Sequence, residues 1–316
     1  IRSAGFKKVL WLMGPMILGM AVTQLNTLAD DIIAKSLSGS AEKGEFFMLW
    51  GRQIAYPVWA GSVASLFYSQ RLYQFPLGVL GISLATAIFP VMSDAAAGND
   101  KPKLAQTTLD GLQGALFLAL PSTAGLMLVA RPLVAAIYQR GRFTEADTAL
   151  ASGVLMFYAV GLSGYFIQQI LPRAFYAMQD SKTPARTAVL AVGANIVLNL
   201  TLIWPLGAGG LALSTALCSY VQVGVLLWLL HRRMGIRFDA GFGRVLIKTL
   251  AATALMAAAG AAVLAAMSRL PATFWMDTAR IGALLVVCVG VYGGAAWKLK
   301  NPMLALVFTA RRRNNE

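Results

Sequence analysis

The sequence predicts an all-α polytopic membrane protein with eight transmembrane helices. Of its 316 residues, 58% are hydrophobic and only 13% are charged, and long apolar stretches recur from residue 9 to the end. About 20 apolar residues cross the hydrocarbon core as a helix, and only helices or closed barrels satisfy every backbone polar group there. Because the apolar stretches are continuous rather than alternating, helices are favoured over a barrel.

Eight spans follow one another in chain order, separated by shorter polar segments. Several are longer than 25 residues, so we expect tilted or amphipathic ends. Proline and glycine interrupt most of them, and such interruptions kink membrane helices. The predicted spans are residues 9–37, 62–93, 111–139, 148–178, 184–205, 209–230, 244–268 and 280–299.

The segment between the first two spans, residues 38–61, differs from the rest in composition. It mixes charged side chains with Trp50, Tyr56 and Trp59. Aromatic residues of this kind favour the membrane interface. The charges at Glu42 and Lys43 argue against a ninth span, so we predict an interfacial insertion.

The basic residues behind the net charge of +14 lie mainly in the loops between the predicted spans. In a soluble protein such a charge would suggest nucleic acid. Here the lysine and arginine residues concentrate in alternate loops, as the positive-inside rule requires. We therefore predict no nucleic-acid partner, a multi-pass protein of the bacterial cytoplasmic membrane, and both termini on the cytoplasmic side.

The cysteine and histidine content bounds the chemistry. Cys218 and Cys288 both lie within apolar stretches, and His231 is the only histidine. This pattern offers neither a disulfide framework nor zinc-ligand spacing. No segment contains a phosphate-binding glycine loop or a nucleophile elbow either. A carrier is therefore favoured over an enzyme.

One predicted span carries an arginine in its interior. Arg71 lies about two turns inside residues 62–93, with no acidic residue within a turn on either side. A charge at membrane depth is costly and normally faces a water-filled cavity or a ligand. Arg71 is our candidate to hold a phosphate or pyrophosphate, with Tyr68 and Gln74 beside it. The alternatives are a structural pair with a distant carboxylate and snorkelling to the interface.

A second group of polar side chains suggests a cation site. Asp30 lies near the end of the first span, Asn195 and Asn199 share one helix face, and Thr215 lies on the sixth span. Oxygen ligands of this kind suit a hard cation. Interhelical hydrogen bonding is the alternative. Arg173, by contrast, we place near the cytoplasmic surface, where it would cap a helix or meet headgroups.

Four segments of the sequence carry a resemblance to a known family. They are YSQRLYQFPLGVLGISLATAIFPVMS (68–93), RGRFTEADT (140–148), LPRAFYAMQDSKTPART (171–187) and PLGAGGLALSTAL (205–217). Together they resemble the MurJ (MviN) family of lipid II flippases, within the multidrug/oligosaccharidyl-lipid/polysaccharide transporter superfamily. The resemblance covers nearly all of the chain and aligns it with the last eight of the family's fourteen helices.

This resemblance implies a function beyond what the spacing shows. MurJ-like proteins move lipid II, the lipid-linked peptidoglycan precursor, to the outer leaflet by alternating access, and their cavity arginine matches Arg71. The resemblance also implies sodium at Asp30, Asn195, Asn199 and Thr215, with an acidic residue expected where Asn199 stands. It further implies a missing N-terminal lobe of six helices as partner, which agrees with a first residue that is not methionine.

The resemblance divides the chain in two. Residues 1–230 would form a six-helix transport bundle that includes the insertion at about 38–61. Residues 231–316 would add two helices with a groove for the lipid tail, and the small residues of 244–268 suit either such a groove or close helix packing. Membrane lipids are therefore expected partners.

Four alternatives remain open at this stage. The same superfamily contains flippases for other polyprenyl-linked glycans and drug or cation antiporters, although Arg71 argues for an anionic cargo. A membrane-embedded enzyme acting on polyprenyl-phosphate sugars would need paired carboxylates with basic partners, and Asp30-Asp31 lacks such partners. A non-transporting scaffold is the fourth.

Overall fold

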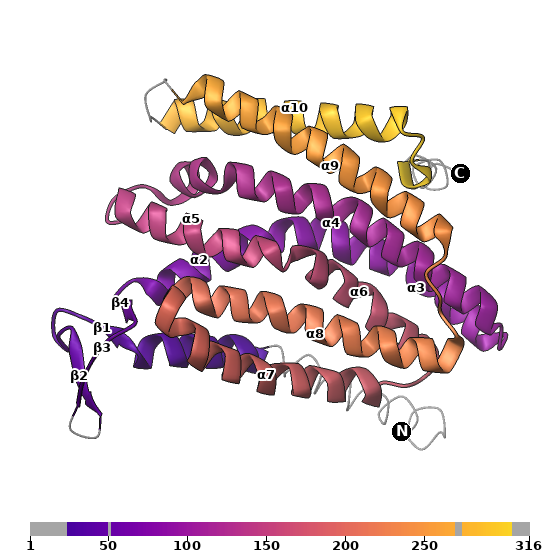
Figure 1. The fold of residues 1–316 in the computed structure, drawn as a ribbon, viewed down its shortest axis with the longest axis horizontal. Helices are drawn as coiled ribbons and strands as arrows, with labels where there is room; N and C mark the ends of the chain where they lie inside the picture. The colour runs from indigo at the N-terminus through magenta and orange to yellow at the C-terminus, as the bar shows by residue number, and fades with distance from the viewer. Residues whose placement is uncertain (1–23, 50–51, 269–273, 305–316) are drawn as a thin grey trace, which may run out of the picture.

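The computed structural model describes residues 24–49, 52–268 and 274–304, and helices dominate these ranges (Figure 1). A helix over residues 24–36 comes first. The later helices are α2 (Ser62–Pro76), η1 (Leu77–Ile82, a π-helix), α3 (Ser83–Ala97), α4 (Lys101–Tyr138), α5 (Glu145–Val160), α6 (Leu162–Ala177), α7 (Lys182–Leu206), α8 (Ala208–Met234), α9 (Ala240–Met267) and α10 (Phe274–Lys298).

Apolar helices long enough to cross a membrane number six in the described part of the chain, or seven if the bent pair α5–α6 counts as one span. The first predicted span, residues 9–37, lies partly outside the described residues, which begin at residue 24. The polytopic helical class is confirmed, and the count of eight stays a prediction. Side chains on the outer helix faces agree with lipid contact, since Val286 is 71% exposed and Ile247 68%.

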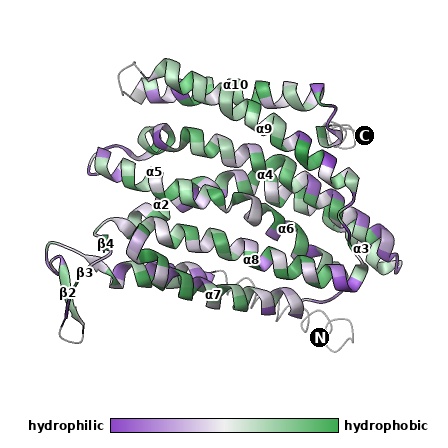
Figure 2. Ribbon diagram, viewed as in Figure 1, coloured by the Kyte–Doolittle hydropathy of each residue, from purple (hydrophilic) through white to green (hydrophobic). Residues whose placement is uncertain are grey.

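The helices lie side by side along the long axis of the molecule (Figure 1). Hydrophobic colour follows their length, and the hydrophilic colour gathers mainly toward their ends (Figure 2). α9 and α10 pack against each other and against α4, while α7 and α8 form a helical hairpin. The buried core lies between these layers and includes Leu112, Phe166 and Phe175.

The predicted start of the third span at residue 111 was wrong, because α4 begins at Lys101. The Asp100 side chain accepts a hydrogen bond from the Lys103 backbone N–H at 3.0 Å and caps the helix. Pro102 occupies the first turn, where its missing N–H costs nothing. An apolar-run criterion does not detect this polar first part of the helix.

The predicted span 148–178 is two helices, α5 and α6, bent by 44°. The break falls at Gly161, where a Cβ would lie 2.7 Å from the Ala216 Cα of α8. The Tyr220 hydroxyl of α8 donates to the Val160 carbonyl and lies 2.7 Å from Ser163 Oγ. A neighbouring helix therefore satisfies the backbone group at the break, as membrane burial requires.

Residues 38–61 form strands, which the all-α prediction did not foresee. β2 (Phe46–Leu49) pairs antiparallel with β3 (Arg52–Ala55), with Phe46 opposite Ala55. β1 (Ser38–Gly39) pairs in parallel with β4 (Val58–Trp59) and brings the two ends of the segment together. The hairpin projects from one end of the bundle (Figure 1). The described part of the insertion thus adds no spanning helix.

Candidate functional site

Arg71 lies on an exposed face of α2. Its guanidinium carbon stands 4.8 Å from the centroid of the Phe67 ring, one turn earlier on the same helix. The part of the chain that the structure describes offers Arg71 no hydrogen bond and no ion pair. The structural pair with a carboxylate, one of the alternatives from the sequence, is therefore not formed within the described residues.

The polar residues around Arg71 divide between two faces of α2. Gln74 is exposed beside Arg71 and Tyr68 is half-buried, whereas Leu72 and Tyr73 are buried against the bundle. The structure thus places all three predicted ligand-binding side chains, Arg71, Tyr68 and Gln74, at or near one surface. That surface joins a cation with groups that can donate hydrogen bonds, which suits an anionic oxygen-rich ligand.

A second basic side chain, Arg173, contacts the continuous helical segment formed by α2, η1 and α3. The Arg173 guanidinium of α6 lies 3.5 Å from the Ile82 carbonyl and 3.3 Å from Thr86 Oγ1. Ile82 ends the π-helical segment, and the Thr86 hydroxyl donates to the same carbonyl. The sequence interpretation of Arg173 as a surface residue missed this contact, because its partners in η1 and α3 are about 90 residues away in sequence.

The four residues of the predicted cation site come together although they lie on three helices. Asp30 is only 6% exposed and Asn199 is fully buried. The Asn199 amide donates to Asp30 Oδ1, and Thr215 Oγ1 donates to Asp30 Oδ2 at 3.2 Å. Asn195 lies 2.8 Å from Asn199 and 3.2 Å from Thr215. Asn26 adds a contact of 3.4 Å to Asp30, which the sequence analysis missed.

The oxygen set of this cluster fits a hard monovalent cation. The buried Asn199 Oδ1 has no hydrogen-bond partner among the described residues, and an unsatisfied buried acceptor is costly. Thr215 Oγ1 also contacts the Leu211 carbonyl at 3.2 Å, which places a further oxygen beside the cluster. With the Asn195 amide nitrogen turned toward Asp30 Oδ1 at 2.9 Å, its oxygen accepts from the Thr215 backbone N–H at 3.1 Å. With one carboxylate, the cluster suits a singly charged ion.

At Gly260, a small residue of α9 allows close helix packing. A Cβ at Gly260 would lie 2.6 Å from Leu128 Cδ1 of α4 and 3.1 Å from Cys288 Sγ of α10. Gly260 therefore allows three helices to approach closely. Leu255 and Val289 remain exposed on this pair, so the outer surface is still apolar.

Comparison with known families gives one consistent result. The family model described as lipid II flippase MurJ matches residues 1–276. A protein of Vibrio cholerae serotype O1, named probable lipid II flippase MurJ, is 33% identical over 230 residues, covering 73% of this chain and 40% of that protein. A Rickettsia prowazekii protein of the same name is 28% identical over 300 residues, covering 93% and 54%. This chain thus spans about half the length of these relatives.

Solved structures show the same fold. A structure described as lipid II flippase MurJ in an inward closed conformation matches with a TM-score of 0.66 and 22% identity, over 95% of this chain and 57% of that one. A transporter of the MOP superfamily from Pyrococcus furiosus matches with a TM-score of 0.58 and 17% identity, over 95% and 66%. At these identities the likeness concerns the fold alone.

Proposed function

This chain belongs to the MurJ family of lipid II flippases, and from that premise we propose that it forms the C-terminal lobe of a flippase for lipid II. The family consists of transporters rather than enzymes. The cargo would cross the bacterial cytoplasmic membrane by alternating access, with an N-terminal lobe of six helices facing the exposed side of α2. Both termini of the chain would lie in the cytoplasm, in keeping with the distribution of basic loops.

The observation that carries this proposal is the Arg71 guanidinium. It stands exposed on a membrane-spanning helix without an ionic partner in the described residues. A cation in this position gains most from a ligand that brings negative charge into a region of low dielectric. The pyrophosphate of lipid II would accept two parallel hydrogen bonds from Arg71, with Gln74 and Tyr68 adding neutral donors.

A sodium ion would bind beside Asp30. The carboxylate, the amide oxygens of Asn195 and Asn199, and Thr215 Oγ1 would supply its oxygen ligands. When bound, the ion supplies a positive charge that neutralises Asp30 among buried side chains. Because Asp30, Asn199 and Thr215 come from three helices, occupancy would favour the arrangement that keeps those helices together.

The pair α9–α10 would contact the lipid tail of the substrate. Leu255, Val286 and Val289 leave its outer surface apolar, and an isoprenoid chain needs such a surface along the bilayer. Residues 231–316 would then form a unit added to the transport bundle of residues 1–230.

A flippase for another polyprenyl-linked glycan is the second candidate. The same contact between Arg71 and a pyrophosphate would serve any lipid of this class, because the diphosphate is common to them. A drug antiporter of the same superfamily fits less well, since an exposed arginine repels cationic cargo.

Complementation of a bacterium depleted of its own lipid II flippase tests the proposal. The complete reading frame that carries this chain should restore growth, and the 316 residues alone serve as a parallel sample. Arg71→Ala should abolish rescue at normal protein level, because the pyrophosphate contact is lost. Arg232→Ala is the matched control, since Arg232 also lies over an aromatic ring, that of Trp228 at 4.0 Å, but at the far end of α8. Normal growth with Arg71→Ala would remove the assigned role.

A further inference from the structure

Three aromatic side chains from separate segments meet beside Arg71. Tyr68 lies on α2, Tyr138 is the last residue of α4, and Phe143 lies in the loop before α5. The Tyr68 ring centroid is 4.6 Å from that of Tyr138 and 5.6 Å from that of Phe143. The centroids of Tyr138 and Phe143 are 6.0 Å apart. We refer to Tyr68, Tyr138 and Phe143 as the aromatic cluster.

The aromatic cluster differs from the packed core. All three side chains are half-buried, whereas Tyr73, Tyr158 and Tyr165 form a separate group that is buried. The difference lies in exposure rather than in pairing, since the buried Tyr165 hydroxyl also has no partner among the described residues. Neither hydroxyl of the aromatic cluster takes part in a hydrogen bond within the described ranges. Both are therefore available to a ligand.

Arg71 is part of the same surface. Its guanidinium lies over Phe67, whose ring is 5.7 Å from that of Tyr68. A ligand whose negative group meets Arg71 would thus bring the adjoining part of its structure against Tyr68 and Tyr138. The surface combines one cation with flat apolar faces and free hydroxyl groups.

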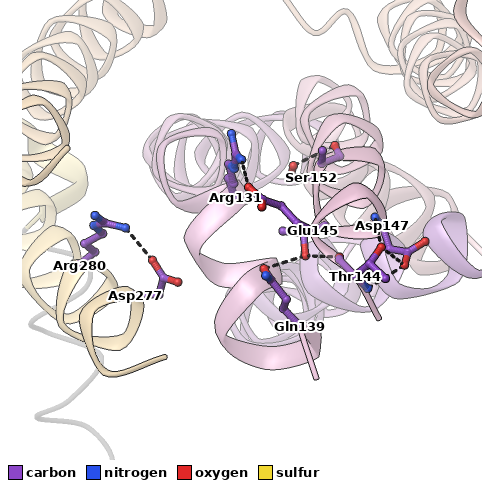
Figure 3. Close-up of polar contacts among 10 residues, drawn as sticks. Arg131, Gln139, Thr144, Glu145, Asp147, Ser152, Asp277 and Arg280 are labelled. Carbon is purple, nitrogen blue, oxygen red and sulfur yellow. Dashed lines mark hydrogen bonds and ion pairs between the residues drawn. The ribbon is translucent and has the colours of Figure 1, made fainter. Parts of the chain in front are cut away.

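The loop that carries Phe143 is held in place at both ends. Figure 3 shows the corner between α4 and α5, with an ion pair and several hydrogen bonds around it. The Thr144 side chain and backbone exchange hydrogen bonds with Asp147, a reciprocal cap at the start of α5. The pairs that fix the corner are Thr144–Asp147 (2.8 Å), Gln139–Thr148 (3.1 Å) and Arg131–Glu145 (2.9 Å). A loop tied in this way presents Phe143 in one position, which lowers the entropy lost on binding.

We propose that the aromatic cluster is a stacking platform for the first sugar of the cargo, the sugar linked directly to the pyrophosphate that Arg71 holds. The inference rests on the proposed function. The C–H bonds on one face of a sugar ring carry small positive charges and pack against the negative face of an aromatic ring. The sugar hydroxyls would meet the phenol groups of Tyr68 and Tyr138. Recognition of glycan and of diphosphate would therefore occupy adjacent parts of one surface.

Binding of two lipids that differ only in the sugar tests this proposal. The complete protein in lipid nanodiscs is titrated with undecaprenyl pyrophosphate, and separately with the same lipid carrying its first amino sugar. Wild-type protein should bind the sugar-bearing lipid more tightly. Tyr138→Leu should reduce affinity for that lipid by roughly two- to tenfold, the range of an aromatic contact, and leave affinity for the bare pyrophosphate unchanged.

Three further variants separate the explanations. Arg71→Ala should weaken both lipids equally, and Tyr138→Phe should keep most of the sugar preference because the ring remains. Trp228→Leu, which removes a distant aromatic residue, should change neither affinity. Equal loss of both lipids in Tyr138→Leu would overturn the platform and leave the diphosphate site standing. Failure of the wild type to bind either lipid would refute the proposed function together with the platform.

Discussion

Replacing Asn199 by aspartate should make the stability of the protein depend on sodium. Asn199 is fully buried and its amide donates to Asp30 Oδ1, so Asn199→Asp places two carboxylates in contact. Two unit charges about 4 Å apart repel by about 4 kcal/mol at an effective dielectric constant of 20. A bound cation relieves this repulsion. A monovalent ion present at one hundred times its Kd would stabilise the folded protein by about 2.7 kcal/mol.

Thermal unfolding of the purified complete protein measures this effect. Melting is compared in sodium chloride and in choline chloride of equal ionic strength, at a pH near 8 so that a shared proton competes less. The complete protein is much longer than 250 residues, so each kcal/mol shifts its midpoint by less than the roughly 2–4 °C typical of a domain of about 150–250 residues. Sodium should therefore raise the midpoint of Asn199→Asp by a few degrees, and that of the wild type by less. Asn199→Leu removes the ligand and should show no sodium effect. Equal midpoints for Asn199→Asp in both salts would refute the cation site.

Two other predictions concern the two ends of the α7–α8 hairpin. Gly210→Ala should lower the yield of folded protein and destabilise it by about 3 kcal/mol or more, because the new Cβ collides with the Leu202 carbonyl of α7. Gly224→Ala is the control: its Cβ meets nothing within 4 Å, so it should not lower the melting midpoint in the same assay. At Asp180, burial opposes ionisation, but hydrogen bonds from Thr183 and the contact with Arg233 outweigh it and hold the pKa below its ordinary value. The stabilisation is thus present above the unfolded pKa near 4 and is lost as the pH falls through the lower folded pKa. Asp180→Asn keeps an oxygen for the Thr183 N–H but loses the charge that meets Arg233, so it should destabilise the protein at pH 7 by roughly 1 kcal/mol or less and by less at pH 3. An equal loss of stability at both pH values would contradict this account.

The sequence was most informative about the membrane spans. A helix that crosses a bilayer needs a long apolar run, and such runs can be read directly from the sequence. Every predicted span after residue 61 coincides with observed helix. The same criterion misplaced the start of α4, since the capping by Asp100 is local chemistry that hydropathy averages away. The break at Gly161 was also missed, because it depends on a hydroxyl from α8 that lies about 60 residues later.

The site was only partly predictable. The spacing of Asn195 and Asn199 places both on one helix face. Their polar character within apolar spans suggested a site shared with Asp30, and the family resemblance implied it, but the meeting itself depends on the packing of three helices. Arg71 was found from its charge in an apolar span. Tyr138 and Phe143 gave no such signal, because an aromatic residue in a membrane protein is ordinary and only its neighbours show a role.

Under the proposed function, the length of α4 sets the size of the unit that would move. Its 38 residues extend about 57 Å, well beyond a hydrocarbon core of about 30 Å, and it contacts α3, α5, α6, α9 and α10. A rod of this length, packed on both sides, cannot tilt while its neighbours stay still. Rocking of this lobe would therefore move α9 and α10 through the surrounding lipid together with α4. The rate of the proposed cycle would then depend on the thickness and viscosity of the bilayer.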